Sequence, residues 1–255
     1  MISWAGRGED VLLDRLFKLQ SPAKYVDIGC ARPREGSVTY HLYKLGWRGL
    51  TIDLRPELQK EWRKIRPKDS HKTFAVSAES KKMGLKNQGF RTQLVPPSSS
   101  EKFIRTTNVA TLIKIYNNEF DSLPKLIKLD IEGLEYEVIK EMLKLHFEAE
   151  IFIVEVVDQI GSNFFIRKES IKIKSLMKKN GYVLVLNDGV NLWFVKALSK
   201  LINKTVWAPA YPGVEKFIPY NMTFKNRIKN KILLIFPFVY QMFYVKNLIS
   251  KKRHQ

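Results

Sequence analysis

The chain has 255 residues, of which 45% are hydrophobic and 27% are charged. This composition is globular and excludes a collagen-like or wholly disordered chain. The one cysteine, Cys30, excludes an intrachain disulfide framework and a cysteine zinc cluster. The start of the chain lacks the apolar run of a signal peptide, and no apolar run reaches the length of a membrane span. The sequence therefore predicts a cytoplasmic protein.

The formal charge of +19 is large and unevenly spread. Residues 199–255 hold eleven Lys and Arg but only one acid, Glu215. This shift predicts a folded domain over residues 1–198 and a basic extension over residues 199–255. A basic chain attracts anionic partners such as a membrane, a nucleic acid or a substrate, but an abundance of surface lysine alone gives the same charge.

Strands and helices alternate along the first 198 residues. Apolar spacing and helix-start residues predict helices at 9–19, at 38–45 after an N-cap at Ser37, from Pro56, and at 109–116, 134–145 and 171–179. Apolar and β-branched runs predict strands at 24–28, 50–52, 73–76, 126–129 and 151–157, and a hairpin of 182–186 with 191–195. Residues 78–108 are polar and irregular, which predicts an exposed excursion or lid without a secure element. The pattern indicates an α/β fold with a mostly parallel sheet and an antiparallel edge.

Acidic residues lie at the ends of four predicted parallel strands. They are Asp27, Asp53, Asp130 and Glu155. Ligands in such sheets bind beyond the carboxyl ends of the strands. Asp53 lies 24 residues after Gly29, which is close to the spacing at which an acid binds ribose hydroxyls. The turn after Gly29 lacks the G-x-G-x-x-G pattern that a pyrophosphate requires. The sequence therefore favours a nucleoside cofactor without phosphates, most commonly S-adenosylmethionine, over NAD or FAD.

Five strings of residues form a pattern that is more specific than any one of them. They are SWAGRGEDVLL (3–13), YVDIGCARPREGSVTYHLYKLGWRGLTIDLRP (25–56), RPKD (66–69), FAVS (74–77) and IKLDIEGLEYEVIKEM (127–142). In this order and spacing the strings resemble the FkbM-type methyltransferases over about residues 3–196. The resemblance implies a Rossmann-like class I methyltransferase fold, with a mostly parallel seven-stranded sheet, helices on both faces and a terminal antiparallel hairpin. It also implies an O-methyltransferase that uses S-adenosylmethionine to methylate hydroxyls, typically of sugars or natural products.

The resemblance further implies which residues bind the cofactor. They are Asp27, Gly29, Asp53, Ala75, Ser77 and Asp130. Within this set, Asp53 takes the ribose, and Asp130 begins an acidic motif, completed by Glu132 and Gly133, that faces the methionine end and the substrate. Two departures stand in the first motif: Cys30-Ala31 replaces a frequent Ala-Asn, and Val38 replaces a frequent Asn. Each departure removes an amide that could bind the cofactor or order the loop.

Methyl transfer requires an aligned acceptor oxygen, and a general base near its proton assists the reaction. The candidates for this catalytic role are Asp130, Glu132, Glu155 and, from the N-terminal segment, Glu9. The histidines His41, His71 and His146 are less suitable, because they are predicted on a helix, in a loop and at a helix end. A Mg²⁺ ion on Asp130, Glu132 and Glu155 is an alternative way to activate the acceptor. Three acids do not define a metal site, so we predict none.

The extension contains an apolar segment, Ile232–Val245, with Lys and Arg on both sides. As a helix it would be about 21 Å long, which is short of the ~30 Å hydrocarbon core of a bilayer, and Pro237 interrupts it. We therefore predict a basic helical extension whose residues 226–255 bind an anionic membrane surface peripherally. Packing on the domain or on a second copy of the chain, as a homo-oligomer, is the alternative.

Two other functions fit the charge. An RNA ribose 2′-O-methyltransferase would use it to bind nucleic acid. Enzymes of that class commonly carry a Lys-Asp-Lys-Glu tetrad with one Lys after the fifth strand, and no Lys directly follows Glu155 here. The second alternative is a non-catalytic basic scaffold that retains the methyltransferase fold.

Overall fold

A seven-stranded sheet organises the chain. The computed structural model describes residues 2–202 and 216–217, apart from Lys18, residues 89–90, Glu101, residues 161–162 and Arg167. The sheet strands are β2 (Lys24–Ile28), β3 (Arg48–Asp53), β4 (Ser70–Thr73), β10 (Leu126–Leu129), β11 (Ile151–Glu155), β14 (Tyr182–Asn187) and β15 (Asn191–Lys196). They lie in the order β14-β15-β11-β10-β2-β3-β4, and β15 pairs antiparallel with both of its neighbours, β14 and β11, whereas the other pairs are parallel. The predicted mostly parallel sheet with an antiparallel terminal hairpin is confirmed.

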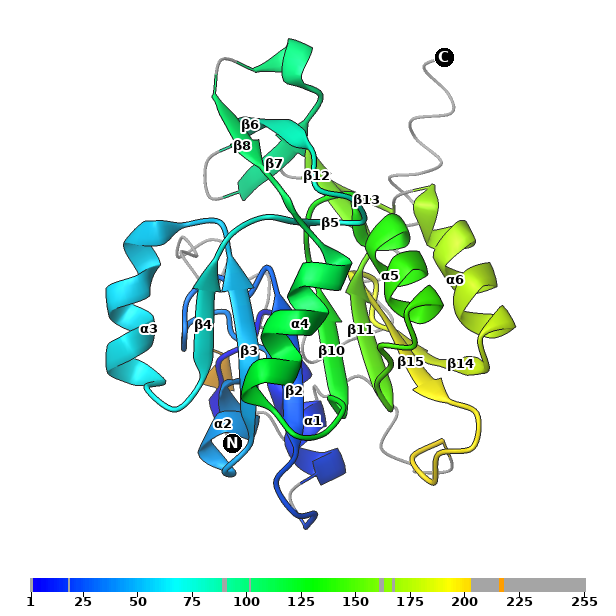
Figure 1. Cartoon of the computed structure of the whole chain (residues 1–255). Helices are drawn as coiled ribbons and strands as arrows, with labels where there is room; N and C mark the ends of the chain where they lie inside the picture. The colour runs from blue at the N-terminus through cyan, green and yellow to red at the C-terminus, as the bar shows by residue number, and fades with distance from the viewer. Residues whose placement is uncertain are drawn as a thin grey trace.

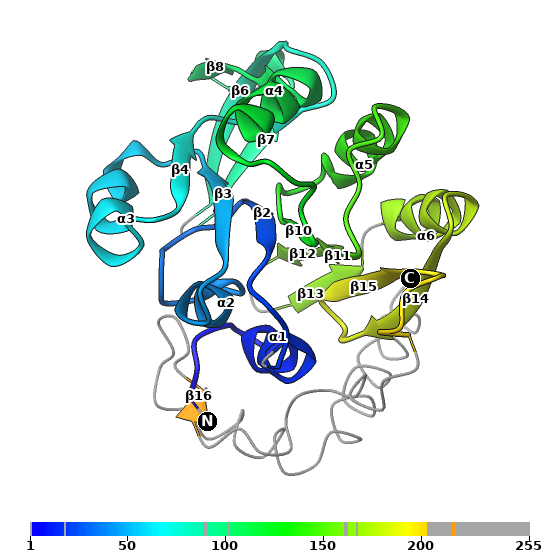
Figure 2. The same ribbon diagram turned by 60° about the horizontal axis from the view of Figure 1, so that its bottom comes forward.

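Helices cover both faces of this sheet. They are α1 (Glu9–Phe17), α2 (Tyr40–Lys44), α3 (Gln59–Ile65), α4 (Val109–Glu119), α5 (Glu135–Lys144) and α6 (Glu169–Lys179), with short 3-10 turns η1 (Pro56–Leu58) and η2 (Pro97–Ser99). Figures 1 and 2 show α4, α5 and α6 on one face, α1 and α2 on the other, and α3 beside the edge strand β4. The sheet is therefore the middle layer of three.

Alternation along the central strands separates two hydrophobic cores. Val26 and Ile28 of β2 pack in the core that includes residues of α4, α5 and α6, whereas Tyr25 packs in the core that includes residues of α1. Successive side chains of a strand point to opposite faces, so Asp27 lies on the same face as Tyr25. Lys128 of β10 pairs with Asp27 in register and shares that face. Two charged side chains therefore enter the interior side by side near the carboxyl ends of the strands.

Small strand units lie above the carboxyl ends of the sheet, as Figure 1 shows. They are the pair of β5 (Val76–Ser77) with β9 (Thr107–Asn108), the three-stranded sheet of β6 (Lys82–Gln88), β7 (Arg91–Val95) and β8 (Phe103–Arg105), and the hairpin of β12 (Val157–Ile160) with β13 (Asn163–Ile166). The expectation that residues 78–108 contain no secure element was wrong. Many residues of these strands are polar, so their pairing leaves no clear alternation of apolar and polar residues in the sequence.

The third parallel strand is also displaced from its prediction. It covers Ser70–Thr73 rather than residues 73–76, which contribute only the short strand β5. The sheet ends at β4, so this strand pairs only with β3, and its four residues are only half-buried. A polar edge strand of this kind lacks the apolar run that marks a strand in a sequence. His71 consequently lies in a strand, and its predicted place in a loop was wrong.

Two smaller boundaries differ as well. Thr39, rather than the predicted Ser37, is the N-cap of α2, and its side chain makes no capping hydrogen bond. The predicted strand 151–157 ends at Glu155, because the backbone N–H of Val156 donates to the carbonyl of Val190 and β12 begins afterwards.

The N-terminus meets a piece of the basic extension. β1 (Ile2–Ser3) pairs in parallel with β16 (Lys216–Phe217), a pair that Figure 2 shows beside the N-terminus. Apart from these two residues, the extension beyond Ile202 lies outside the described residues, and so does the predicted membrane-binding segment 226–255. Among the helices described, none is both long enough and apolar enough to cross a bilayer.

Candidate active site

A cleft opens at the carboxyl ends of β2, β3 and β10. It is lined by Ile28, Gly29, Ala31, Ile52, Asp53, Leu54, Arg55, Phe74, Ala75, Val76, Leu94, Asp130, Ile131 and Glu132. Five predicted site residues are thereby brought together: Gly29, Asp53, Ala75, Asp130 and Glu132. Leu94 comes from β7, so the predicted lid contributes to the wall of the cleft.

Gly29 forms the floor of the cleft because no other residue fits there. Its φ is +75°, and a Cβ atom built on it would lie 1.8 Å from the carbonyl oxygen of Asp130. The Gly29 N–H donates to the carbonyl of Ile52 at 2.8 Å. The turn after β2 therefore packs tightly between the ends of β3 and β10. Because Gly29 has no side chain, its backbone faces the ligand.

Asp53 ends β3 with its carboxylate in the cleft wall. Its oxygens accept hydrogen bonds from the backbone N–H groups of Ala31 (2.9 Å) and Arg55 (3.0 Å). The Arg55 guanidinium adds two more, from Nε at 2.8 Å and from Nη2 at 3.1 Å. A carboxylate offers about four acceptor positions, so Arg55 occupies those that a ribose diol would need.

Lys128 is a buried cation behind the cleft that the sequence analysis missed. Its Nζ donates to the carbonyl of Gly29 at 2.9 Å and to Asp130 Oδ2 at 3.1 Å, and it lies 3.7 Å from Asp27 Oδ1. Burial lowers the pKa of Lys128, but Asp130, Asp27 and Glu155 outweigh burial and raise its pKa above the usual value. The ammonium group is therefore permanently charged and holds the ends of β2 and β10 together.

The predicted first-motif acid, Asp27, lies beneath the cleft rather than in its wall, and is 1% exposed. Its Oδ2 accepts a hydrogen bond from the hydroxyl of Thr39 at 2.7 Å. Its Oδ1 is buried and has no hydrogen-bond partner among the described residues. Lys128 Nζ lies 3.7 Å from Oδ1, beyond hydrogen-bond distance, so this oxygen keeps its capacity to accept a hydrogen bond from a ligand cation.

The acidic motif after β10 is shaped by Glu135 as well as by its predicted members. Glu135 accepts hydrogen bonds from the backbone N–H groups of Ile131 (3.0 Å) and Gly133 (2.9 Å). Glu132 between them has a φ of +56°, an uncommon conformation for a residue with a side chain. Glu135 thus fixes the turn that presents Glu132 to the cleft, a role the sequence analysis did not assign.

The other two predicted catalytic acids, Glu9 and Glu155, lie on either side of Asn191. Asn191 begins β15 directly opposite Glu155, and its Nδ2 donates to Glu9 Oε1 at 3.0 Å. Glu9 begins α1 and is 7% exposed. Burial, and then the nearby Asp188 carboxylate, raise the pKa of Glu9 to about 7. A carboxyl that titrates near neutrality is suited to accept a proton.

The remaining candidates are occupied elsewhere. The Ser77 hydroxyl interacts with the Glu79 carbonyl and Thr106 Oγ1, and Ser77 is not among the lining residues of the cleft. His71 Nδ1 lies 3.1 Å from Thr51 Oγ1, and its ring stacks on Trp62. Burial lowers the pKa of His71 to about 4, so this ring is neutral at physiological pH. His41 of α2 places its Nε2 3.2 Å from Oδ2 of Asp10 in α1.

The residue types that bind metal ions are not clustered among the described residues. Within residues 2–202 and 216–217, as far as the structure describes them, no three His, Cys, Asp or Glu side chains are arranged to hold an ion.

A seven-stranded sheet in this order, with a cleft at the carboxyl ends of its parallel strands, is the class I methyltransferase fold. The sequence model of the "Methyltransferase FkbM domain" matches residues 27–184, which is more than half of the chain. The chain belongs to the FkbM methyltransferase family, and its cofactor is S-adenosylmethionine.

Solved structures with a similar fold are distant. An FkbM methyltransferase from Methylobacillus flagellatus KT is 12% identical, with a TM-score of 0.41 over 75% of this chain and 48% of that one. A TehB-like S-adenosylmethionine-dependent methyltransferase from Corynebacterium glutamicum is 15% identical, with a TM-score of 0.41 over 74% of this chain and 87% of that one. A search of curated proteins gives no match.

The residues of the cleft fit this cofactor. S-adenosylmethionine carries an ammonium group, a ribose diol and a flat base. Asp27 Oδ1 is a buried acceptor without a hydrogen-bond partner among the described residues, which suits the ammonium group. Asp53 would bind the diol with its carboxylate oxygens after the Arg55 guanidinium moves off them. Leu54 and Phe74 would form an apolar wall against the adenine ring. The bound cofactor would supply an activated methyl group.

Proposed function

We propose that the chain transfers this methyl group to a hydroxyl oxygen of a sugar, a glycan or a related small molecule. The observation that carries the proposal is the placement of Glu9 at the carboxyl edge of the sheet, where Asn191, opposite Glu155, donates to Glu9 Oε1 at 3.0 Å, and where burial and Asp188 raise the pKa of Glu9 to about 7. A hydroxyl must lose its proton when its oxygen forms the new bond to carbon, and a carboxylate with a pKa near 7 is matched to that task. A neutral amine acceptor depends less on a base, because its nitrogen lone pair is nucleophilic before any proton is lost.

In this proposal, different residues orient the acceptor, make room for the cofactor and accept the proton. Asp130 and Glu132 line the cleft and orient the acceptor, and Gly29 leaves room for the methionine end. Asp130 is a poor base because Lys128 holds it in an ion pair at 3.1 Å. Glu9, placed by Asn191 beside Glu155, takes the proton. Alignment in the cleft contributes most of the acceleration and the base adds to it.

The test is a transfer assay with methyl-labelled S-adenosylmethionine. The acceptors are nucleotide sugars, free glycans, a lipid-linked glycan fraction and RNA, and the methylated atom is located by NMR. We expect label on a hydroxyl oxygen of a carbohydrate. Label on an RNA ribose would instead support the nucleic-acid alternative, and label on nitrogen or carbon would refute O-methylation. Binding of S-adenosylhomocysteine without transfer to any acceptor would favour the non-catalytic scaffold.

The Asp130→Asn variant tests the acceptor-orienting role. The substitution keeps the shape of the side chain but removes its charge, so we expect kcat to fall about 10- to 100-fold. Lys128 keeps Asp27 and Glu155 as charged neighbours, so the melting temperature should change much less than turnover. Full activity in this variant would remove Asp130 from the site.

We also propose that the extension binds anionic membrane surfaces. The support is the apolar segment Ile232–Val245 with its flanking Lys and Arg residues. Deletion of residues 226–255 should release the protein from vesicles of anionic phospholipid in a flotation assay, while S-adenosylhomocysteine still binds. Flotation of the truncated protein would contradict the proposal, and a loss of oligomers on truncation would support packing between copies instead.

A further inference from the structure

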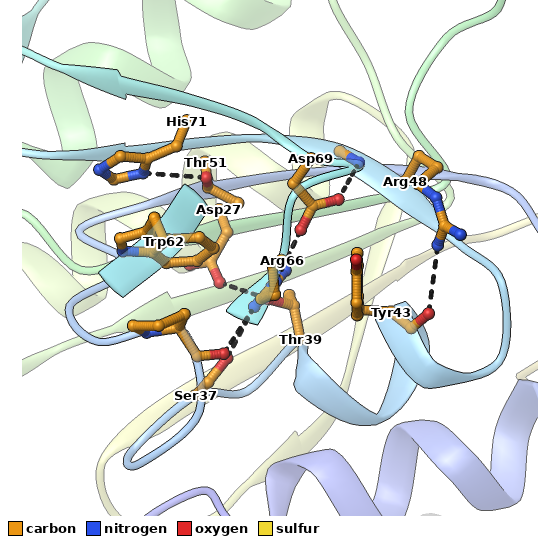
Figure 3. A network of polar contacts seen from close by, with 12 residues as sticks. Asp27, Ser37, Thr39, Tyr43, Arg48, Thr51, Trp62, Arg66, Asp69 and His71 are labelled. Atoms are coloured by element: carbon orange, nitrogen blue, oxygen red, sulfur yellow. Dashed lines mark hydrogen bonds and ion pairs between the residues drawn. The ribbon is translucent and has the colours of Figure 1, made fainter. Parts of the chain in front are cut away.

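Arg66, from the RPKD string, is the centre of a buried polar network next to the cofactor site. The residue is 1% exposed and follows α3. Figure 3 shows its guanidinium between the loop of Ser37 and Thr39 and the residues of the sheet edge. All five N–H groups of the guanidinium have an acceptor. They are Asp69 Oδ2 (2.6 Å), the Pro33 carbonyl (3.3 Å), Ser37 Oγ (3.1 Å), Tyr25 Oη and Thr39 Oγ1 (3.0 Å).

Three of these acceptors belong to the loop that follows Gly29. In other nucleotide-binding folds a G-x-G-x-x-G pattern shapes this turn, and the loop after Gly29 lacks that pattern. Three residues of the loop depart from the family pattern. Cys30 packs with Leu58 and Trp62, and Val38 packs in the core that contains α1. Ala31, which stands where the family often has Asn, lines the cleft. None of these three side chains can order the loop by hydrogen bonding as an amide would. Arg66 therefore supplies polar anchors to the loop from within the protein.

The chemistry of arginine fixes the direction of the hydrogen bonds. A guanidinium only donates, so Thr39 Oγ1 must accept from Arg66 Nη2. The hydroxyl proton of Thr39 is then left for Asp27 Oδ2, 2.7 Å away. One oxygen of the Asp27 carboxylate is thereby engaged, and Oδ1 is the oxygen without a hydrogen bond among the described residues.

We propose that Arg66 is a positioning residue of the cofactor site, which acts through Thr39 to hold the Asp27 carboxylate with Oδ1 available to the ammonium group of the cofactor. The proposal rests on the role of Asp27 in binding that group. It assigns a function to the RPKD string, whose Arg66 and Asp69 the sequence analysis left without one. Asp69 completes the unit, because it accepts from Arg66 Nε and from the hydroxyl of Tyr25.

Thr39→Val tests the relay without opening a cavity, since valine keeps the shape and loses the hydroxyl. Affinities are measured by calorimetry for two ligands: S-adenosylhomocysteine, which carries the ammonium group, and methylthioadenosine, which lacks the amino-acid part. We expect S-adenosylhomocysteine to bind about 10-fold more weakly, the effect of one charge-assisted hydrogen bond, and methylthioadenosine to bind as before. Equal losses for both ligands would show a general disordering of the loop and overturn the proposal.

Two controls separate positioning from stability. Thr39→Ser keeps the hydroxyl and should restore the affinity for S-adenosylhomocysteine to within about twofold. Ser37→Ala removes another partner of Arg66 in the same loop but does not touch Asp27. We expect this variant to lower the melting temperature and leave both affinities unchanged. A loss of S-adenosylhomocysteine affinity in Ser37→Ala as large as in Thr39→Val would refute a specific path through Thr39.

An Asp27→Asn variant separates this inference from its premise. If Asp27→Asn binds S-adenosylhomocysteine normally, Asp27 does not receive the ammonium group and the premise fails. If Asp27→Asn binds weakly and Thr39→Val binds normally, only the relay fails. Should Thr39→Val not fold, Arg66→Lys replaces it, because lysine retains the charge beside Asp69 but cannot reach both Asp69 and Thr39. The same ligand selectivity is expected for that variant.

Discussion

Replacing Asp53 with alanine should weaken the binding of S-adenosylhomocysteine at least about 100-fold. Each hydrogen bond from a ribose hydroxyl to a charged acceptor contributes about 1.5–3 kcal/mol, and the variant loses both. It also loses the bond from the Ala31 N–H to Asp53 Oδ2, so the turn after Gly29 is less well held. Calorimetric titration measures the affinity, and circular dichroism shows whether the variant is folded. Unchanged affinity in a folded variant would contradict the ribose assignment.

Arg55→Ala is the matched control for this experiment. In the structure the Arg55 guanidinium uses the Asp53 oxygens that the diol needs, so ligand and side chain compete for them. We expect Arg55→Ala to bind S-adenosylhomocysteine as tightly as the wild type or more tightly. Weaker binding in Arg55→Ala would show that the guanidinium contacts the ligand rather than competing with it.

The parallel sheet was predictable because its central strands are buried on both faces. Leu126–Leu129 and Ile151–Glu155 are almost continuous apolar runs, and the acids at their ends mark the carboxyl edge. The edge strand Ser70–Thr73 and the strands above the cleft were not predictable in this way. Many of their residues are polar, and pairs such as β3 with β4 and β6 with β8 join segments that a local sequence pattern does not connect.

The predicted cofactor residues that line the cleft were found through spacing and resemblance, but the groups that orient them were not. Arg66 and Asp69 lie in a recognisable string, yet a string alone does not show that the guanidinium is buried. Lys128 carried a stronger signal. A single lysine inside the apolar strand LIKL, two residues before Asp130, is unfavourable unless it is paired with acids. Its partner Asp27 lies 101 residues earlier, and only the register of β10 with β2 brings the two together.

Lys128 and Arg66 act on the same carboxylate from two sides. Lys128 Nζ approaches Asp27 Oδ1 at 3.7 Å, beyond hydrogen-bond distance, while Thr39 binds Oδ2 at 2.7 Å. The carboxylate is therefore stabilised as an anion and still has one oxygen to offer. Under the proposal for Arg66, the acid that would receive the ammonium group is positioned from beneath the loop, through Thr39, instead of by the loop backbone.

Glu9 should give the protein a pH dependence that Glu9→Gln removes. Burial and Asp188 raise the pKa of Glu9 from 4.5 to about 7, so the folded state favours the protonated form. Its stabilising contribution is fully present below pH 4.5 and is lost as the pH rises through about 7. A shift of this size corresponds to about 3 kcal/mol. Between pH 4.5 and 8, the free energy of unfolding of Glu9→Gln should therefore rise by about that amount relative to the wild type, as measured by urea unfolding.

The same ionisation should control turnover. A base with a pKa near 7 is about one-tenth ionised at pH 6 and nine-tenths ionised at pH 8, so kcat/KM with the identified acceptor should rise about tenfold. Glu9→Gln should show a low and flat profile. Asn191→Ala removes the N–H that donates to Glu9 Oε1 and stabilises the carboxylate, so its profile should keep the same shape with the midpoint at higher pH. A stability shift in Glu9→Gln without a change in the rate profile would make Glu9 a buried structural acid and leave Glu132 or Glu155 as the base.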